Sequence, residues 1–234
     1  MMDLSVVIYA VSDEWALKQS LSLIHAQFER GLFKKIVVVD DGSDDGSTPY
    51  IQTHFPGITV IQNEQYLGKA RSINRGVSLL KSKGVLILMA GMTINEAALT
   101  SLWTIFEKGA LFSITCESNS ASHEMLGTMS RDKIWLLPQP LSQVDNERDR
   151  SVRAHIEGVG LFHREYWMQL DGLDPLFDDG LIQSLDLVYA AAKRGWKSTH
   201  TSAFFEDKRV HPDQSWDEIL PVTYYQHAYW FFWK

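Results

Sequence analysis

The sequence predicts an α/β domain built on a mostly parallel sheet with helices on both faces. Short apolar runs rich in Val and Ile alternate with helical patterns over about the first 90 residues. This alternation is typical of βαβ units wound with right-handed crossovers. The chain has 234 residues, of which 45% are hydrophobic and 22% are charged. That length is enough for one domain with a sizeable core.

Each of the first four predicted strands is a short apolar run, as expected for strands buried on both faces. They fall at residues 4–9, 34–39, 58–61 and 85–89. Apolar residues at helical spacing predict the helices between them, over residues 15–28, from Ser47 onward, and over residues 67–80. Ligands of such sheets bind beyond the carboxyl ends of the strands. The loops that follow these four strands are therefore expected to converge on a site.

The second half of the chain has a less regular pattern. Asn95 is a candidate N-cap for a helix over residues 95–106. Further helices are expected over residues 164–170 and 181–193, strands over residues 110–116 and 197–201, and a polar loop over residues 142–153. No internal repeat and no Gly/Pro/Ser-rich linker divides the sequence. We therefore expect a single domain over residues 1–234.

Composition excludes several classes of function. The formal net charge is −7 without a basic block, so nucleic acid is not an expected partner. Cys116 is the one cysteine; it cannot form an intramolecular disulfide, which agrees with a reducing compartment. No apolar run approaches the ~20 residues that span a bilayer, and the N-terminus does not resemble a signal peptide. The expected location is the cytoplasm, with the inner face of a membrane left open.

The chain ends in a tail, residues 212–234, whose last residues, 224–234, are dense in Tyr, Trp and Phe. So many aromatic rings must be covered by something. Three alternatives stay open: the tail packs on its own domain, it packs on a second copy or a partner protein, or it touches a membrane surface.

The most informative motif is Asp40-Asp41-Gly42-Ser43, which follows the second predicted strand directly. Carboxylates at such a strand end can accept hydrogen bonds from a base N–H or a ribose hydroxyl, and Gly42 permits a sharp turn. The alternative is a solvated turn in which an Asp or Ser caps the next helix.

This strand and its ending resemble the second strand of the family-2 glycosyltransferases. Residues 63–76 give a second match, because Asn63, Gly68, the pair Ala70-Arg71 and Gly76 follow the family's pattern. The resemblance spans about residues 4–211. It implies a GT-A fold, Rossmann-like, with a nucleotide-binding half at about residues 1–94 and an acceptor-side half at about residues 95–211.

The resemblance also implies a donor substrate, a nucleotide sugar of the UDP or GDP type. Residues 9–12 replace the usual Pro-Thr-Tyr-Asn that lines the base and ribose. Gly68 at a helix start, with two cations on the same turn, can cradle a diphosphate; a surface helix with solvated cations is the alternative. The implied nucleotide-binding residues are Tyr9, Ala10, Ser12, Asp40, Asp41, Gly68, Lys69 and Arg71.

Two departures from the family concern the chemistry. The family's Asp-x-Asp, which holds a divalent metal, is replaced by Ala90 and Met92. Neither can ligate Mg²⁺ or Mn²⁺, so no metal cofactor is expected, and His211 remains a weak ligand candidate.

The second departure is in the acceptor-side half. Residues 160–165 and 171–174 resemble the family segment that leads to Glu-Asp-x-Asp-Leu, which includes the catalytic base. Here that stretch is residues 183–187, in which Asp186 alone keeps its acid. Asp178 and Asp179 are alternative candidates for the base.

Two hypotheses about function follow. In the first, the chain is an inverting, metal-independent transferase that moves a sugar from a nucleotide sugar to a glycan acceptor in glycan or polysaccharide biosynthesis. In the second, it is a catalytically inactive relative that serves as a binding or assembly module. A nucleotidyltransferase of related fold is disfavoured, because residues 9–12 lack the Gly-rich signature expected near the N-terminus.

Overall fold

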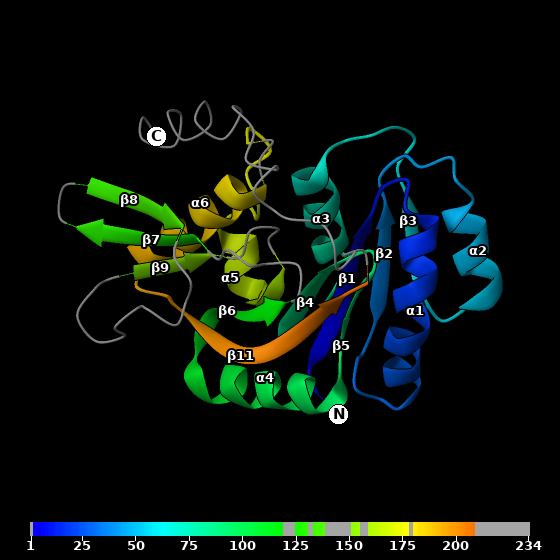
Figure 1. Cartoon of the computed structure of the whole chain (residues 1–234), viewed down its shortest axis with the longest axis horizontal. Coiled ribbons are helices and arrows are strands. Elements are labelled where there is room, and N and C mark those ends of the chain that lie inside the picture. The colour runs from blue at the N-terminus through cyan, green and yellow to red at the C-terminus, as the bar shows by residue number, and fades with distance from the viewer. Residues whose placement is uncertain are drawn as a thin grey trace.

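The computed structural model describes residues 2–118, 125–130, 133–138, 151–154, 159–177 and 180–208 (Figure 1). Within these residues, eight strands form one sheet in the order β3-β2-β1-β4-β10-β6-β11-β5. Three more form a small sheet in the order β8-β7-β9. The strands are β1 (Leu4–Ala10), β2 (Ile36–Asp40), β3 (Thr59–Gln62), β4 (Gly84–Met89), β5 (Met92–Ile94), β6 (Leu111–Ser118), β7 (Met125–Ser130), β8 (Lys133–Pro138), β9 (Ser151–Ala154), β10 (Gly160–His163) and β11 (Lys197–Asp207). The helices are α1 (Glu14–Glu29), α2 (Ser47–His54), α3 (Lys69–Ser78), α4 (Glu96–Gly109), α5 (Arg164–Gln169) and α6 (Gly180–Lys193).

The first four strands form a parallel block. β1 pairs with β2 on one side and with β4 on the other, and β3 extends the block beyond β2. Every residue of β1, β2 and β4 is buried, because helices cover both faces and apolar side chains point in both directions. The register places Ala10 beside Asp40, and Asp40 beside Gln62. The carboxyl ends of the three strands are therefore level.

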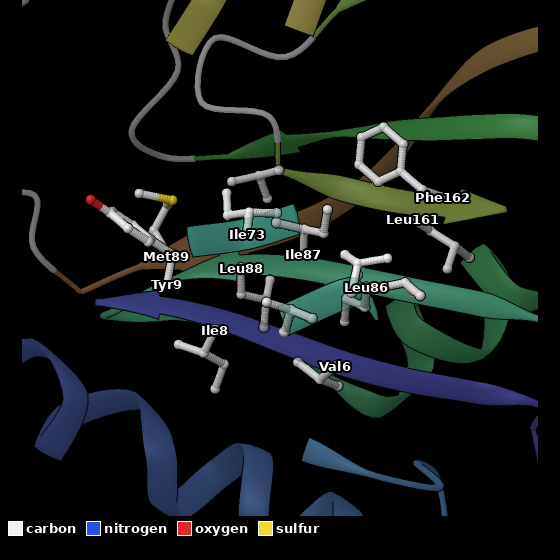
Figure 2. Packing of buried hydrophobic residues seen from close by; sticks show 14 of the residues in the cluster. Val6, Ile8, Tyr9, Ile73, Leu86, Ile87, Leu88, Met89, Leu161 and Phe162 are labelled. Carbon is white, nitrogen blue, oxygen red and sulfur yellow. The ribbon is translucent and has the colours of Figure 1, made fainter. Parts of the chain in front are cut away.

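Helices lie on both faces of this block. Figure 2 shows Ile73 of α3 on one side of β1 and β4, while Ile8 points to the opposite side, where α1 lies. α3 approaches the sheet closely at Gly76, where an added Cβ would lie 2.8 Å from methyl groups of Val7 and Val39. A glycine is needed there because a side chain would push the helix away from the strands.

The remaining strands continue the sheet with mixed directions. β10 is antiparallel to both β4 and β6, and β11 runs parallel to β6. β11 is irregular between Thr201 and Phe204, and its last residues pair with β5. Figure 1 shows this long, curved strand passing from β6 toward the end of β5, above α4.

The predicted α/β class and mostly parallel sheet are confirmed. All six predicted strands and all six predicted helices are present, and their ends shift by at most three residues, except that β11 continues to Asp207 instead of ending at residue 201. Asn95 caps α4 as predicted, because its Oδ1 accepts from the Ala98 N–H at 2.8 Å. The loop predicted over residues 142–153 is wrong at its end, since β9 begins at Ser151 and pairs with β7. In the described part of the chain, no helix is both long and apolar enough to cross a bilayer.

Candidate functional site

The polar residues singled out in the sequence meet at the carboxyl edge of the parallel block. Backbone hydrogen bonds continue one step past the strands there: the Asp41 N–H donates to the Ala10 carbonyl at 2.9 Å, and the Asn63 N–H donates to the Asp40 carbonyl at 2.8 Å. The Ala90 N–H donates to the Tyr9 carbonyl at 2.8 Å in the same way. The sheet thus holds the loops after β1, β2, β3 and β4 side by side.

Asp41 is at the centre of this edge and is fully buried. Its Oδ1 accepts from Asn63 Nδ2 at 2.8 Å and from the Leu67 N–H at 2.9 Å. Its Oδ2 accepts from the Tyr9 hydroxyl at 3.1 Å and from the Gly68 N–H at 3.0 Å. A carboxylate has about four lone-pair sites, and all four are used here. Asp41 therefore fixes the β3–α3 loop and the start of α3.

Tyr9 contributes a buried phenol to the same network. Burial raises its pKa above the usual 10.0, and so do the negative charge of Asp41 and the hydrogen bond to it. The phenol therefore keeps its proton and remains a donor to Asp41. Figure 2 shows the Tyr9 ring and the Met89 side chain together at this end of β1 and β4.

Asp40 is also fully buried, and its carboxylate shapes the turn after β2. Oδ1 accepts from the Ser43 N–H at 3.0 Å, and Oδ2 accepts from the Thr48 hydroxyl in the first turn of α2 at 2.7 Å. Gly42 has a φ of +79°, and a Cβ there would lie 2.5 Å from the backbone of Gln65 and Tyr66. The Asp-Asp-Gly-Ser turn is therefore packed directly against the β3–α3 loop.

The same turn is tied to the loop after β1. The Ser12 N–H donates to Ser43 Oγ at 2.8 Å, and the exposed Ser12 has a left-handed φ of +47°. The Glu14 N–H donates to Asp45 Oδ2 at 2.8 Å. Burial raises the pKa of Asp45, but hydrogen bonds from Ser47 and Glu14 outweigh it and lower the pKa overall. Sequence reasoning missed this role of Asp45, although its place before a helix start was the available signal.

The start of α3 carries the predicted cations. Gly68 occupies the N-cap position with a φ of +89°, and a Cβ on it would have no atom within 4 Å, so space lies in front of it. Lys69 is half-buried, and the exposed Arg71 guanidinium folds back to donate to the Leu67 carbonyl at 3.3 Å. The first N–H groups of a helix have no partner within it and favour anions. The first turn of α3 therefore carries two cationic side chains, Lys69 and Arg71, beside the N–H groups of the helix start.

The residues at the family's metal position do not suit a metal. Ala90 is 3% exposed and Met92 is 1% exposed, and a tight corner at Gly91 joins them. The Gly91 N–H donates to Ser20 Oγ at 3.1 Å, and the Gly91 carbonyl accepts from the Lys208 N–H at 3.0 Å. Hard cations need oxygen ligands, and these two side chains offer none. Within the described ranges, no cluster of three or more His, Cys, Asp or Glu side chains could hold a metal ion.

The acceptor-side candidates are only partly placed. Asp186 lies in the middle of α6 and is half-buried, and its neighbours Gln183 and Ser184 are buried on the same helix. Asp178, Asp179 and His211 lie outside the described residues, as does the aromatic tail at residues 212–234. The sequence analysis missed a link between α3 and the segment between α5 and α6. The Asn74 side-chain amide forms hydrogen bonds with the backbone of Asp171 and Leu173 in that segment.

Comparison with known proteins agrees with this architecture. The family described as Glycosyl transferase family 2 matches residues 5–169. No match was found among curated proteins. Solved structures with similar folds include S. aureus TarS 1–349, with a TM-score of 0.69 and 15% identity. The alignment covers 99% of this chain and 64% of the TarS chain.

Two further structures are similar. A mannosyltransferase from Pyrobaculum calidifontis, solved with GDP-Man and Mn²⁺, has a TM-score of 0.65 and 14% identity, with 90% of this chain and 58% of that chain covered. TarS 1–349 in complex with UDP has a TM-score of 0.67 and 14% identity, with 99% and 64% covered. The chain thus spans less than two thirds of each of these proteins. The predicted GT-A fold is confirmed.

Proposed function

Because the chain belongs to glycosyl transferase family 2, we propose that it transfers a sugar from a UDP- or GDP-type nucleotide sugar to a glycan acceptor, with inversion and without a divalent metal. The observation that carries the proposal is the contrast between two strand ends. After β2, Asp41 accepts hydrogen bonds from Leu67 and Gly68 and so fixes the start of α3, which carries Lys69 and Arg71. After β4, the positions of the family's metal-binding acids are held by Ala90 and Met92, which are apolar and buried.

The donor is proposed to bind with its diphosphate in front of Gly68. Solved relatives of similar fold hold UDP in one case and GDP-Man in another, which supports a nucleoside diphosphate at this edge. During transfer, the bond between the anomeric carbon and the diphosphate oxygen breaks, and negative charge builds on the leaving group. The N–H groups of the first turn of α3, with Lys69 and Arg71, would stabilise that charge.

The acceptor hydroxyl needs a base to take its proton as its oxygen forms the new bond to the anomeric carbon. Asp186 is the first candidate, because it keeps its acid in the family's base segment; Asp178 and Asp179 are the alternatives. We expect Asp186→Asn to abolish transfer while UDP or GDP binding stays within about twofold, as for a group that acts only in the transition state.

Metal independence is tested directly by calorimetric titration with UDP, GDP and their sugars, in Mn²⁺ and in EDTA. Equal affinity in both conditions, together with sugar transfer in EDTA, is the expected result. Binding or transfer that appears only with Mn²⁺ would overturn the metal-independent part of the proposal. A purified protein that neither hydrolyses nor transfers sugar from a panel of donors would overturn the enzymatic part.

One observation favours a second candidate function, that of an inactive binding or assembly module. Both metal-site acids are replaced by Ala90 and Met92, and Ser184 occupies the position of the second acid of the base segment. On this alternative, the protein binds no nucleotide sugar, and the tail at residues 212–234 is an interface to another copy or to a partner protein. Light scattering before and after deletion of residues 224–234 tests the interface, since an unchanged monomeric mass would exclude self-association through it.

The proposed setting is the cytoplasm, including the inner face of a membrane, in glycan or polysaccharide biosynthesis. Flotation of the purified protein with anionic vesicles tests the membrane contact, since the protein would remain in the dense fraction if its aromatic tail does not insert.

A further inference from the structure

Tyr66 combines an exposed ring with a fixed backbone. The residue is 65% exposed, although it lies in the loop that enters α3. The two residues after it, Leu67 and Gly68, both donate their N–H groups to the buried carboxylate of Asp41. Its own backbone nitrogen packs so closely on Gly42 that a Cβ there would lie 2.5 Å away. The loop is therefore held on both sides of an exposed aromatic residue.

Tyr66 lies near the buried network at this edge of the sheet. Its phenol is near enough to Tyr9 to contribute to the raised pKa of Tyr9. Tyr9 is only 4% exposed. Because 65% of the Tyr66 surface is exposed, its ring is open to solvent. Such a ring offers a flat apolar surface at little further cost in side-chain entropy.

The ring also lies within reach of the proposed phosphate position. Tyr66 precedes Gly68 by two residues, so their Cα atoms are at most about 7 Å apart. Gly68 has open space in front of it. A nucleoside diphosphate extends further than this from its phosphates to its base. A nucleotide with its diphosphate at the start of α3 can therefore place its base on Tyr66.

We propose that the ring of Tyr66 is the stacking surface for the nucleobase of the donor. This inference rests on the proposed function, because it assigns one contact of the same nucleotide site. Stacking of a base on an aromatic ring tolerates different bases, since each base has a π-face. Tyr66 would thus contribute affinity for both UDP and GDP, and the choice between them would come from other residues.

The test is calorimetric titration of the wild-type chain and of Tyr66→Ala, Tyr66→Leu and Tyr66→Phe with UDP, GDP and inorganic pyrophosphate. Leu79→Ala is the matched control, because Leu79 is 48% exposed at the other end of α3. We expect Tyr66→Ala and Tyr66→Leu to weaken UDP and GDP binding by about 5- to 150-fold. Tyr66→Phe and Leu79→Ala should stay within about threefold, and pyrophosphate, which has no base, should bind all variants alike.

Each contrary outcome has a distinct meaning. If the wild type binds UDP or GDP and Tyr66→Ala binds it equally well, the stacking role is wrong while the proposed function stands. If Tyr66→Ala loses pyrophosphate and nucleotide in the same proportion, the ring acts through the loop, and stacking is again excluded. If Tyr66→Leu binds as the wild type does, apolar bulk and not an aromatic face is what matters. A wild type that binds neither nucleotide overturns the proposed function and this inference together.

Discussion

The side-chain amide of Asn74 pairs with the backbone of Leu173 in the way that a neighbouring strand would. Asn74 Nδ2 donates to the Leu173 carbonyl at 2.8 Å, and Asn74 Oδ1 accepts from the Leu173 N–H at 3.0 Å. Asn74 lies on α3, whose first turn faces the nucleotide edge, and Leu173 lies in the segment between α5 and α6. One side chain thus joins the donor-side helix to the segment that leads toward Asp186.

The turn at Gly172 should not tolerate a side chain. Its φ is +73°, and an added Cβ would overlap Asn74 Oδ1 and lie 2.5 Å from Trp167 Nε1. Gly195→Ala is a matched control, since Gly195 has a φ of +78° with no atom within 4 Å of a Cβ. The control should lose about 1–2 kcal/mol from left-handed backbone strain. Gly172→Ala should lose about 1–3 kcal/mol more from overpacking. Urea denaturation measures both, and equal losses would contradict the close packing at Gly172.

Replacing Asp41 by Asn should destabilise the nucleotide edge. The carboxylate accepts four hydrogen bonds, and an amide turns one acceptor into a donor that faces other donors. We expect a loss of about 2–3 kcal/mol in the free energy of unfolding. Asp44→Asn is the control, because Asp44 is exposed three residues along the same turn, and it should change stability by less than about 0.5 kcal/mol. Equal denaturation midpoints for the two variants would argue against Asp41 as the organiser of this edge.

The Tyr9 phenol should make stability fall at alkaline pH. Its pKa is raised above 10.0 in the folded protein, so both states are protonated below about pH 9 and the stabilisation is fully present there. Above the unfolded pKa, the unfolded state loses the proton that the folded state keeps. The free energy of unfolding then decreases by up to about 1.4 kcal/mol per pH unit from this group. Denaturation of wild type and Tyr9→Phe between about pH 8 and 11 tests this; identical slopes would show that Tyr9 makes no such contribution.

Restoring an acid at the family's metal position should damage the fold. Met92 is 1% exposed and pairs with Asp207 across β5 and β11. Met92→Asp places a charge among apolar groups and beside another buried acid, so we expect a loss of about 3–5 kcal/mol. Met92→Leu, which preserves volume, should cost less than about 1.5 kcal/mol. If Met92→Asp folded with wild-type stability, the side chain at this position would have to reach water.

The parallel block was predictable because its signals are local. Buried parallel strands appear in the sequence as uninterrupted runs of Val and Ile, such as residues 36–39 of β2. The helices between them have apolar residues at regular helical spacing. The cap at Asn95 was also readable, since capping depends on a side chain and an N–H only a few residues apart. β5 and β10 gave no comparable signal, because each is very short and is fixed by partners far away in the sequence.

The place of the two strand-end carboxylates was predictable, whereas their contacts were not. Asp40 and Asp41 were identified as carboxylates at a strand end, but their hydrogen bonds depend on where loops from other strands lie. The Asn74 link joins positions 99 residues apart, and no spacing rule connects a helix residue to the backbone of a distant turn. The role of Asp186 stays a prediction. So do all of the predicted nucleotide contacts, which are those of Tyr9, Ala10, Ser12, Asp40, Asp41, Gly68, Lys69 and Arg71.

The corner at Gly91 also has a consequence for how the chain is assembled. β5 follows β4 almost at once, yet its partner β11 ends at Asp207, and the Gly91 carbonyl receives its hydrogen bond from Lys208. During synthesis, the parallel block can form before the rest of the chain emerges, because all of its strands lie within the first 90 residues. The corner beside the proposed donor site must wait until more than a hundred further residues have been translated. A nascent chain stalled before β11 would therefore carry a nearly finished nucleotide edge and an unpaired strand next to it.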